Sequence, residues 1–439
     1  MDWTVKPARR LEGEIRVPGD KSIAHRALIL AALADGLSEI DGLPQGADVL
    51  STAAAVCALG VAVDKNEGVG DSVRIEGRGL RGLRAPSAHI DCGNSGTTMR
   101  LLSGVLAGQS FDSVLTGDRS LRRRPMRRIA EPLRAMGSRF ETAPGGTAPL
   151  EISGSADALR AILHRPEVAS AQVKSCVLLA GLYADASTGV EEPLPTRDHT
   201  ERLLVAMGAN IQVMPAGAGQ LVSVQSEPSL RAIRGRIPAD VSSAAYWIVA
   251  ASLCPESAII LPRVGLNPSR AAIVGLLRSW GCNIEITDRG EWYGEPFGTL
   301  EIRGSEGALA GGRIAAESVP GLIDELPLLA ALGPFTEDGV EIRGASELRV
   351  KESDRIAAIA GALRELGAEV DEFPDGLAVA GSTGLSGGRV SSLGDHRIAL
   401  AVGVVGLAAK EPVTISGADA MNISYPGFSK ALMEAAQKS

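Results

Sequence analysis

The segment RVPGDKS at residues 16–22 returns as RIPADVS at residues 236–242. The second copy starts 220 residues after the first, which is half of the 439-residue chain. Each copy leads into a run rich in Ala and Leu, at 23–35 and at 243–253, whose pattern predicts a helix. A repeat at this spacing predicts a duplicated chain that folds as two lobes.

A shorter repeat lies inside each half. A helical pattern that ends in Gly and is followed by an alternating strand occurs five times, with the glycines at 60, 137, 208, 281 and 367. Each glycine stands where a left-handed helix C-cap is expected. The spacing averages about 77 residues, so the pattern predicts five full α/β copies plus a remainder shared by the two chain ends, three units in each lobe.

The chain is expected to cross from one lobe to the other at the two repeated segments, residues 16–22 and 236–242. We therefore expect a discontinuous first lobe made of residues 1–19 and 239–439, and a second lobe made of residues 20–238.

Composition limits the classes of partner. Hydrophobic residues at 45% and charged residues at 22% are ordinary values for a globular protein. The net charge of −8 argues against broad binding of nucleic acid or anionic membranes, and no apolar run is long enough to span a membrane. The five cysteines show no CxxC spacing, which predicts reduced thiols and a cytoplasmic location. A monomer is the default expectation.

Six predicted helices begin with polar or charged residues and continue as apolar runs, at 19–36, 92–108, 170–182, 239–253, 322–333 and 394–408. Ordinary N-capping explains most of these polar residues taken singly. It does not explain Lys21, Arg100 and Arg397 in first turns, where a cation opposes the helix dipole. Cations there are favoured if an anion lies among them, so the pattern predicts binding of a polyanionic ligand.

Two further segments are rich in charge. Residues 119–134 hold seven arginines, of which Arg124, fixed before Pro125, is the one expected to point at a ligand; a solvated basic helix explains most of the others. Residues 351–355 hold both charge signs at the predicted start of a helix that is otherwise apolar. Surface ion pairing explains any one pair there, whereas the combination favours a proton-transfer site. No HExxH, GxSxG, Walker A or dinucleotide motif occurs, and no metal or organic cofactor is expected.

Eight motifs in this order resemble one family: GDKSIAHR, NSGTTMR, LTGDRSLRRRPM, SAQVKS, RDHTE, DELP, RVKESDR and GDHRIA. They are similar to those of the 5-enolpyruvylshikimate-3-phosphate synthases and extend over essentially the whole chain. The resemblance implies a two-lobed inside-out α/β barrel, each lobe built from three βαβαββ units, with the active site in the cleft between the lobes.

The resemblance also implies the reaction. The 5-hydroxyl of shikimate 3-phosphate adds to carbon 2 of phosphoenolpyruvate while carbon 3 is protonated, and the tetrahedral intermediate then loses phosphate. This step belongs to the shikimate pathway, through which chorismate and the aromatic amino acids are made. It needs no metal or organic cofactor.

Site residues follow from the motifs one by one. The catalytic set implied by the resemblance is Lys21, Asp324, Lys351 and Glu352. Shikimate 3-phosphate is expected to contact Lys21, Ser22, Arg26, Ser170, the backbone amide of Ala171, Gln172, Thr196, Arg197, Asp324 and Lys351. Phosphoenolpyruvate is expected to contact Lys21, Asn94, Gly96, Arg124, Gln172, Arg355, His396 and Arg397.

The chain departs from the family pattern at two positions. Thr196 stands where some members have Ser, which keeps a hydroxyl, and Ile423 stands where some members have a Lys that contacts phosphoenolpyruvate.

The family is the target of the herbicide glyphosate, and two features of this sequence give opposite indications of sensitivity to it. The SAQVK and RDHTE motifs resemble the branch that includes tolerant members, whereas Gly96 keeps the unsubstituted pocket floor expected of a sensitive enzyme.

Two alternatives stay open. The sister enolpyruvyl transferase that acts on UDP-N-acetylglucosamine shares fold and chemistry, but it carries a Cys in a mobile loop and the corresponding region 117–128 has none. The other is a non-catalytic, two-lobed anion-binding protein of the periplasmic kind. The lack of a signal-peptide pattern and the set of Lys351, Glu352 and Asp324 argue against it.

Overall fold

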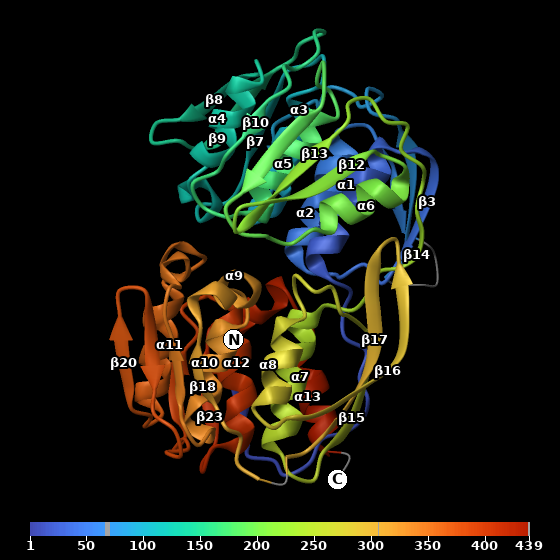
Figure 1. Ribbon diagram of the computed structural model, residues 1–439. Helices are drawn as coiled ribbons and strands as arrows, with labels where there is room; N and C mark the ends of the chain where they lie inside the picture. Colours follow the sequence, from blue (N-terminus) through green and yellow to red (C-terminus); the bar gives the residue numbers. More distant parts are fainter. Residues whose placement is uncertain (66–70, 306, 438–439) are drawn as a thin grey trace. The chain divides into compact units, whose positions relative to one another are not determined.

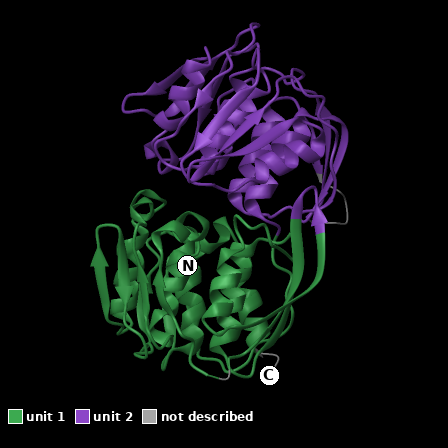
Figure 2. Ribbon diagram, in the orientation of Figure 1, with its two compact units in different colours: residues 1–18, 238–290, 296–439 green, residues 19–237, 291–295 purple. Residues whose placement is uncertain are grey.

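The computed structural model describes residues 1–65, 71–305 and 307–437. The chain divides into two compact units (Figure 2). Unit 1 holds residues 1–18, 238–290 and 296–439, and unit 2 holds residues 19–237 and 291–295. None of the helices in the described ranges combines the length and apolar content needed to cross a membrane.

Unit 2 contains three copies of one motif (Figure 1). The first is α1 (Lys21–Leu33), β3 (Asp35–Asp41), α2 (Ala47–Ala58), β4 (Val63–Lys65) and β5 (Val73–Arg78), with β14 (Arg234–Arg236) as its first strand. The second is β6 (Ile90–Asp91), α3 (Gly96–Leu106), β7 (Ser113–Thr116), α4 (Arg127–Ala135), β8 (Arg139–Ala143) and β9 (Thr147–Ser153). The third is β10 (Leu163–His164), α5 (Ala171–Gly181), β11 (Thr188–Glu192), α6 (His199–Met207), β12 (Ile211–Ala216) and β13 (Gly219–Val224).

Unit 1 repeats the motif, with changes at the chain ends. Its first copy is β2 (Glu12–Glu14), α7 (Val241–Leu253), β15 (Ala258–Gly265), α8 (Ala272–Ser279), β16 (Asn283–Trp292) and β17 (Glu295–Arg303). Its second is β18 (Gly312–Ile314), α9 (Val319–Leu322), α10 (Leu326–Leu332), β19 (Val340–Ile342), α11 (Arg355–Glu365), β20 (Val370–Phe373) and β21 (Gly376–Val379). Its third is β22 (Gly388–Ser391), α12 (His396–Val405), β23 (Val413–Ser416) and α13 (Phe428–Gln437), completed by β1 (Trp3–Val5).

Within the described residues, the strands form five four-stranded sheets and one three-stranded sheet. In a complete sheet such as β10-β11-β13-β12, the first two strands are parallel and the last two join antiparallel. The three-stranded sheet keeps the parallel pair β22 and β23, and β1 from the other end of the chain pairs antiparallel with β23. The expected βαβαββ units are therefore confirmed, and the chain ends share the last one.

The repeat glycines end helices as the sequence predicts. Gly60, Gly137, Gly208, Gly281 and Gly367 follow α2, α4, α6, α8 and α11 and have φ values between +84° and +107°. This left-handed conformation favours glycine because it has no Cβ. Each glycine turns the chain directly toward the next strand.

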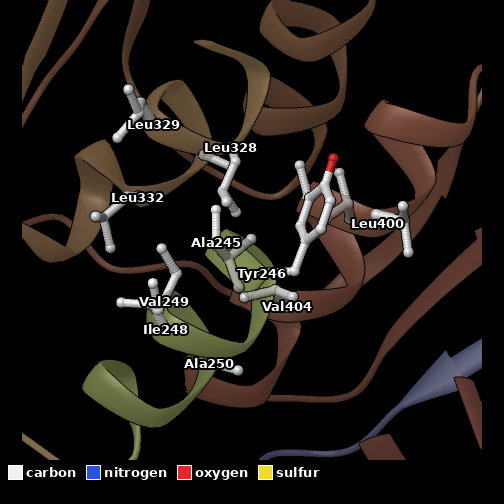
Figure 3. Packing of buried hydrophobic residues seen from close by; sticks show 14 of the residues in the cluster. Ala245, Tyr246, Ile248, Val249, Ala250, Leu328, Leu329, Leu332, Leu400 and Val404 are labelled. Carbon is white, nitrogen blue, oxygen red and sulfur yellow. The ribbon is translucent and has the colours of Figure 1, made fainter. Parts of the chain in front are cut away.

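Three helices form the centre of each unit. In unit 1, all 10 residues of α12 and all 7 of α10 are buried, as are 12 of the 13 in α7. Figure 3 shows their side chains meeting, among them Ile248, Leu328 and Leu400. In unit 2 the central helices are α1, α3 and α5, with 11 of 13, 9 of 11 and 9 of 11 residues buried. Such helices leave little but their ends open to a ligand.

The tip of the β16–β17 hairpin, residues 291–295, is part of unit 2 although the rest of the hairpin belongs to unit 1 (Figure 2). His199 Nδ1 lies 2.8 Å from Glu295 Oε1, and both residues are buried. Trp292 Nε1 donates to the carbonyl oxygen of Arg234 at 3.0 Å. No feature of the sequence indicated that residues 291–295 would belong to unit 2.

Close packing of α3 on α5 depends on Gly104. A Cβ at this position would lie 3.0 Å from the carbonyl carbon of Cys176 and closer still to its oxygen. A backbone carbonyl cannot turn aside as a flexible side chain can. Only glycine therefore allows the two helices to approach this closely.

We expect Gly104→Ala to lower the free energy of unfolding by about 1–3 kcal/mol, because the added methyl must push α3 away from α5. Gly275→Ala in α8 is the matched control, since no atom lies within 4 Å of its added Cβ. That substitution is expected to raise stability by about 0.5–1 kcal/mol through helix propensity. Denaturant unfolding followed by circular dichroism measures both. A Gly104→Ala protein as stable as the parent would show that the two helices have room to separate.

Candidate active site

In unit 2 the predicted site residues gather at the N-terminal ends of the buried helices. Asp20 caps α1, where its Oδ1 accepts from the backbone N–H of Ile23 at 3.0 Å. Lys21, in the first turn, places Nζ 2.9 Å from Asp48 Oδ2 at the start of α2. Asp48 had no role in the sequence analysis because it belongs to none of the eight motifs.

Arg26 is buried one turn further along α1. Its Nε donates to Thr200 Oγ1 at 2.6 Å, its Nη2 to Ser175 Oγ at 2.8 Å and its Nη1 to the carbonyl oxygen of Ser22 at 2.9 Å. Burial lowers the pKa of Arg26 to about 10; the negative charge of Glu201 opposes this shift and the positive charge of Arg197 adds to it. Two predicted cations therefore lie close together, as an anion-binding pocket requires.

The start of α3 carries the predicted phosphoenolpyruvate contacts. Arg124 Nη2 donates to Asn94 Oδ1, and Asn94 Nδ2 donates to Asp118 Oδ2 at 2.7 Å. A Cβ added at Gly96 would lie 2.9 Å from Arg100 Nη1 and 3.4 Å from Arg124 Nη1. Gly96 thus opens directly onto two guanidinium groups.

Gln172 joins α5 to α3. Its Oε1 accepts from Arg100 Nη1 at 2.5 Å, and its Nε2 donates to Thr97 Oγ1 at 2.9 Å. Ser170 caps α5, where its Oγ accepts from the backbone N–H of Val173 at 3.5 Å, and Ala171 is the first helical residue. Arg100 stood out in the sequence as a first-turn cation, and the structure gives it a partner among the predicted site residues.

Thr196 and Arg197 lie in the segment between β11 and α6. The hydroxyl of Thr196 donates to Glu192 Oε1. Arg197 lies near enough to Arg26 to lower its pKa. Unit 2 therefore holds predicted residues from five separate motifs, GDKSIAHR, NSGTTMR, LTGDRSLRRRPM, SAQVKS and RDHTE.

In unit 1 the predicted residues also gather at helix starts. Arg397, in the first turn of α12, donates from Nη1 to the carbonyl oxygen of Asp324 at 2.7 Å and places Nη2 3.4 Å from Asp324 Oδ1. Burial opposes the charged form of Arg397, but Asp324 and its other anionic neighbours outweigh burial and raise the pKa. The Asp324 carboxylate is still partly exposed, at 19%.

Arg355 begins α11 and is almost fully buried. It donates from Nη2 to Glu352 Oε2 at 2.5 Å and from Nε to Asp395 Oδ2 at 2.9 Å, and its Nη1 lies 3.9 Å from Asp324 Oδ1. Burial works against the charged form of Asp395, but Arg355 and then His396 outweigh it, so the pKa of Asp395 lies below its ordinary value. Asp395 also caps α12, where it accepts from the backbone N–H of Arg397 at 2.8 Å.

Lys351 lies apart from this cluster of charges. Its Nζ is 3.6 Å from Glu347 Oε2, and its side chain is 29% exposed. The sequence predicts Lys351 and Glu352 at a helix start. The structure begins α11 only at Arg355, after the cap Asp354, so both residues lie in the preceding bends.

A chain of buried hydrogen bonds, which no sequence motif predicted, lies beneath the N-terminal ends of α1, α2 and α3. His25 Nδ1 lies 2.6 Å from Thr52 Oγ1, which lies 2.5 Å from Thr98 Oγ1, and Thr98 Oγ1 donates to Ser95 Oγ at 2.7 Å. Burial lowers the pKa of His25 to about 3, with Asp48 opposing the shift and Lys21 adding to it. His25 is therefore neutral at physiological pH, and the chain links three helix ends.

The chain is similar to known proteins over nearly its whole length. The model of the EPSP synthase (3-phosphoshikimate 1-carboxyvinyltransferase) family matches residues 5–432. The 3-phosphoshikimate 1-carboxyvinyltransferase of Methylococcus capsulatus is 48% identical over 427 residues, covering 97% of this chain and 95% of its own length. The enzyme of that name from Synechococcus is 49% identical over 428 residues, covering 97% and 94%. The solved structure of EPSP synthase from Acinetobacter baumannii has a TM-score of 0.87 and 38% identity, covering 99% of this chain and 98% of its own.

We expect the stability of the protein to fall as pH drops from about 6.5 toward 3, in part through His25. The unfolded chain binds a proton on this ring near pH 6.5 and the folded chain only near pH 3, so the contribution of His25 is complete above pH 6.5 and shrinks below it. Between pH 7 and pH 4.5 the loss is about 2 kcal/mol.

His25→Asn, which cannot titrate, should show a flatter dependence of unfolding free energy on pH over the same range. Denaturant unfolding at several pH values compares the two slopes. Identical slopes for the parent and the variant would mean that the pKa of His25 is the same in the folded and unfolded chains.

Proposed function

The chain belongs to the EPSP synthase family, and from this premise we propose which of its residues carry each part of the reaction. The enzyme transfers the enolpyruvyl group of phosphoenolpyruvate to the 5-hydroxyl of shikimate 3-phosphate and releases phosphate, a step in the synthesis of aromatic amino acids. The observation that carries the proposed site is the placement of cationic side chains at or beside the ends of buried helices. Both substrates are anions, and these are the groups that bind phosphate and carboxylate.

We assign the shikimate 3-phosphate contacts in unit 2 to Ser22, Arg26, Ser170, Ala171, Gln172, Thr196 and Arg197, together with Lys21. The positive charge of Arg197 acts on the buried Arg26 and lowers its pKa, and a bound anion beside the two guanidinium groups would offset this repulsion. Hydroxyl and amide groups at the α5 end supply further donors for the same ligand. Asp324 and Lys351 of unit 1 complete the proposed set.

We assign phosphoenolpyruvate to Lys21, Asn94, Gly96, Arg124 and Gln172 of unit 2 and to Arg355, His396 and Arg397 of unit 1. Three observations support this choice: Arg124 is held by Asn94, Gly96 opens onto guanidinium groups, and Arg397 and Arg355 stay charged beside carboxylates. Guanidinium groups suit a ligand that carries both phosphate and carboxylate, because each can donate two parallel hydrogen bonds.

Proton transfer in this proposal divides between two groups of residues. Asp324 is the candidate base for the 5-hydroxyl, since its carboxylate is partly exposed and its Oδ1 lies 3.4 Å from Arg397 Nη2. Lys351 and Glu352 are the candidates for protonation of carbon 3 and for its later deprotonation, when phosphate leaves. Lys21 contacts both substrates and is able to carry a proton between them.

A cytoplasmic location and a monomeric state are also part of the proposal. The location is supported by the five cysteines, none of which forms a disulfide and four of which are buried. Transfer to UDP-N-acetylglucosamine is not favoured, because the family model and the relatives compared are named for the shikimate 3-phosphate reaction.

Release of phosphate from the purified protein tests the function directly. With no metal added, release should require both phosphoenolpyruvate and shikimate 3-phosphate, and Lys21→Ala should reduce the rate at least 100-fold because it removes a cation and a proton carrier. Lys410→Ala, at an exposed position past the C-terminal end of α12, the end opposite to Arg397, is the control and should keep the parental rate. Release that needs UDP-N-acetylglucosamine instead would identify the sister reaction, and no release with either acceptor would favour a binding protein.

The role of Asp324 has a separate test in Asp324→Asn. The backbone carbonyl that holds Arg397 is unchanged by this substitution, so the variant removes the charge and leaves that contact in place. We expect kcat to fall about 10²- to 10⁴-fold with a small change in the KM of phosphoenolpyruvate. Steady-state phosphate release measures both, and full turnover would remove Asp324 as the base.

A further inference from the structure

A buried ammonium lies one turn behind the N-terminal end of α5. Lys174 Nζ is 2.8 Å from Glu192 Oε2 and 2.6 Å from Glu201 Oε1, and all three side chains are buried. Burial works against the charged form of Lys174, but Glu201 and Glu192 outweigh it and raise the pKa. The two carboxylates of this trio therefore favour the charged form of the Lys174 ammonium.

The two carboxylates stand at the two ends of one segment. Glu192 is the last residue of β11, and Glu201 lies in the first turn of α6. Between them run Thr196 and Arg197, which we assign to the shikimate 3-phosphate subsite. Lys174 Nζ thus binds both ends of the segment and lies 3.4 Å from the carbonyl oxygen of Thr196 in its middle.

Further hydrogen bonds of Glu192 hold the segment between Glu192 and Glu201 in place. Its Oε1 accepts from the hydroxyl of Thr196, and its Oε2 accepts from Gln220 Nε2 of β13 at 2.9 Å as well as from Lys174. Each oxygen of this carboxylate is therefore engaged. The position of Thr196 is fixed from both its backbone and its side chain.

Residues next to the trio also position Arg26, another predicted contact of shikimate 3-phosphate. Ser175 follows Lys174 in α5, and Thr200 precedes Glu201 in α6; the hydroxyls of these two residues lie 2.7 Å apart and both accept from Arg26. A shift of α6 relative to α5 would therefore move Arg26 together with Arg197. Both cations depend on the distance between the same two helix ends.

Fold stability alone does not call for a charge at this place. Burying an ion pair or triad is often no better for stability than filling the same volume with apolar side chains. Three nearby positions of α5 are filled in that simpler way, since Val173, Cys176 and Val177 are all apolar and buried. The charged trio occurs where the segment with the predicted ligand contacts must be held.

We propose that Lys174 is a positioning residue for the shikimate 3-phosphate subsite, which it maintains by fixing residues 192–201 against α5. This inference rests on the proposed assignment of Thr196 and Arg197 to that substrate. Lys174 itself does not touch the substrate in this scheme. It acts by fixing the positions of Thr196, Arg197 and Arg26.

The test compares substrates in Lys174→Met, which keeps the length of the side chain and removes its charge. We expect the KM of shikimate 3-phosphate and its Kd by titration calorimetry without phosphoenolpyruvate to rise at least tenfold. The KM of phosphoenolpyruvate should change less than threefold. Lys174→Arg, which restores the charge, should recover part of the lost affinity.

Leu179→Ala is the matched control for a general loss of stability. Leu179 is a buried residue of the same helix and is no part of the trio. Its truncation should lower the melting temperature as Lys174→Met does and leave the KM of shikimate 3-phosphate unchanged. An equal rise of that KM in both variants would overturn the positioning role.

Gln220→Leu covers the case in which Lys174→Met does not fold. Gln220 is only partly buried and touches the trio through Glu192 alone among the contacts described, so we expect a folded protein with a two- to fivefold rise in the Kd of shikimate 3-phosphate. Unchanged affinity in Gln220→Leu and in any folded Lys174 variant would refute the inference. A parent protein that does not bind shikimate 3-phosphate would instead remove the subsite assignment itself, and the positioning role with it.

Discussion

Burial of the central helices on nearly all sides is the constraint from which the site follows. A helix such as α12, with every residue buried, can meet a ligand only at an end. The N-terminal end offers unpaired backbone N–H groups and a partial positive charge, which suit anions. The side chains that bind or transfer charge must then be placed in the first turn or in the segment just before it. Lys21, Gln172, Arg355 and Arg397 all follow this rule.

The two units carry cations near the N-terminal ends of their helices, but at positions that do not correspond in the repeat. Asp20 and Asp240, the echoed acidic residues, both cap the helix that follows them. Arg26 of α1, however, corresponds in the echo to Tyr246 of α7, and Lys21 corresponds to Val241. Unit 2 therefore takes its cations from α1 and its neighbours, whereas unit 1 takes Arg355 and Arg397 from α11 and α12. Duplication kept the scaffold while the charged groups diverged.

Buried charges in both units are held by more than one partner. Arg355 contacts Glu352 and Asp395, and Lys174 contacts Glu192 and Glu201. Such networks carry a large desolvation penalty, and removing one member leaves an unpaired charge that is strongly unfavourable. They also allow little movement, because each guanidinium or ammonium is fixed in several directions at once. Rigid placement of charge is what addition and elimination on an anionic substrate require.

The sequence by itself determined the repeat, the helices and their glycine ends, because these depend on local pattern: apolar periodicity and a left-handed residue at a helix end can be read from neighbours in the chain. Its motifs also indicated the family to which the chain belongs. Only the tertiary structure decided that Lys21 pairs with Asp48, that Arg100 holds Gln172 and that Lys174 joins Glu192 to Glu201. These pairs lie 18 to 72 residues apart, and no local pattern records which polar side chains meet when helices pack. The physical reason is that a contact's energy depends on burial and geometry, which exist only after the chain has folded.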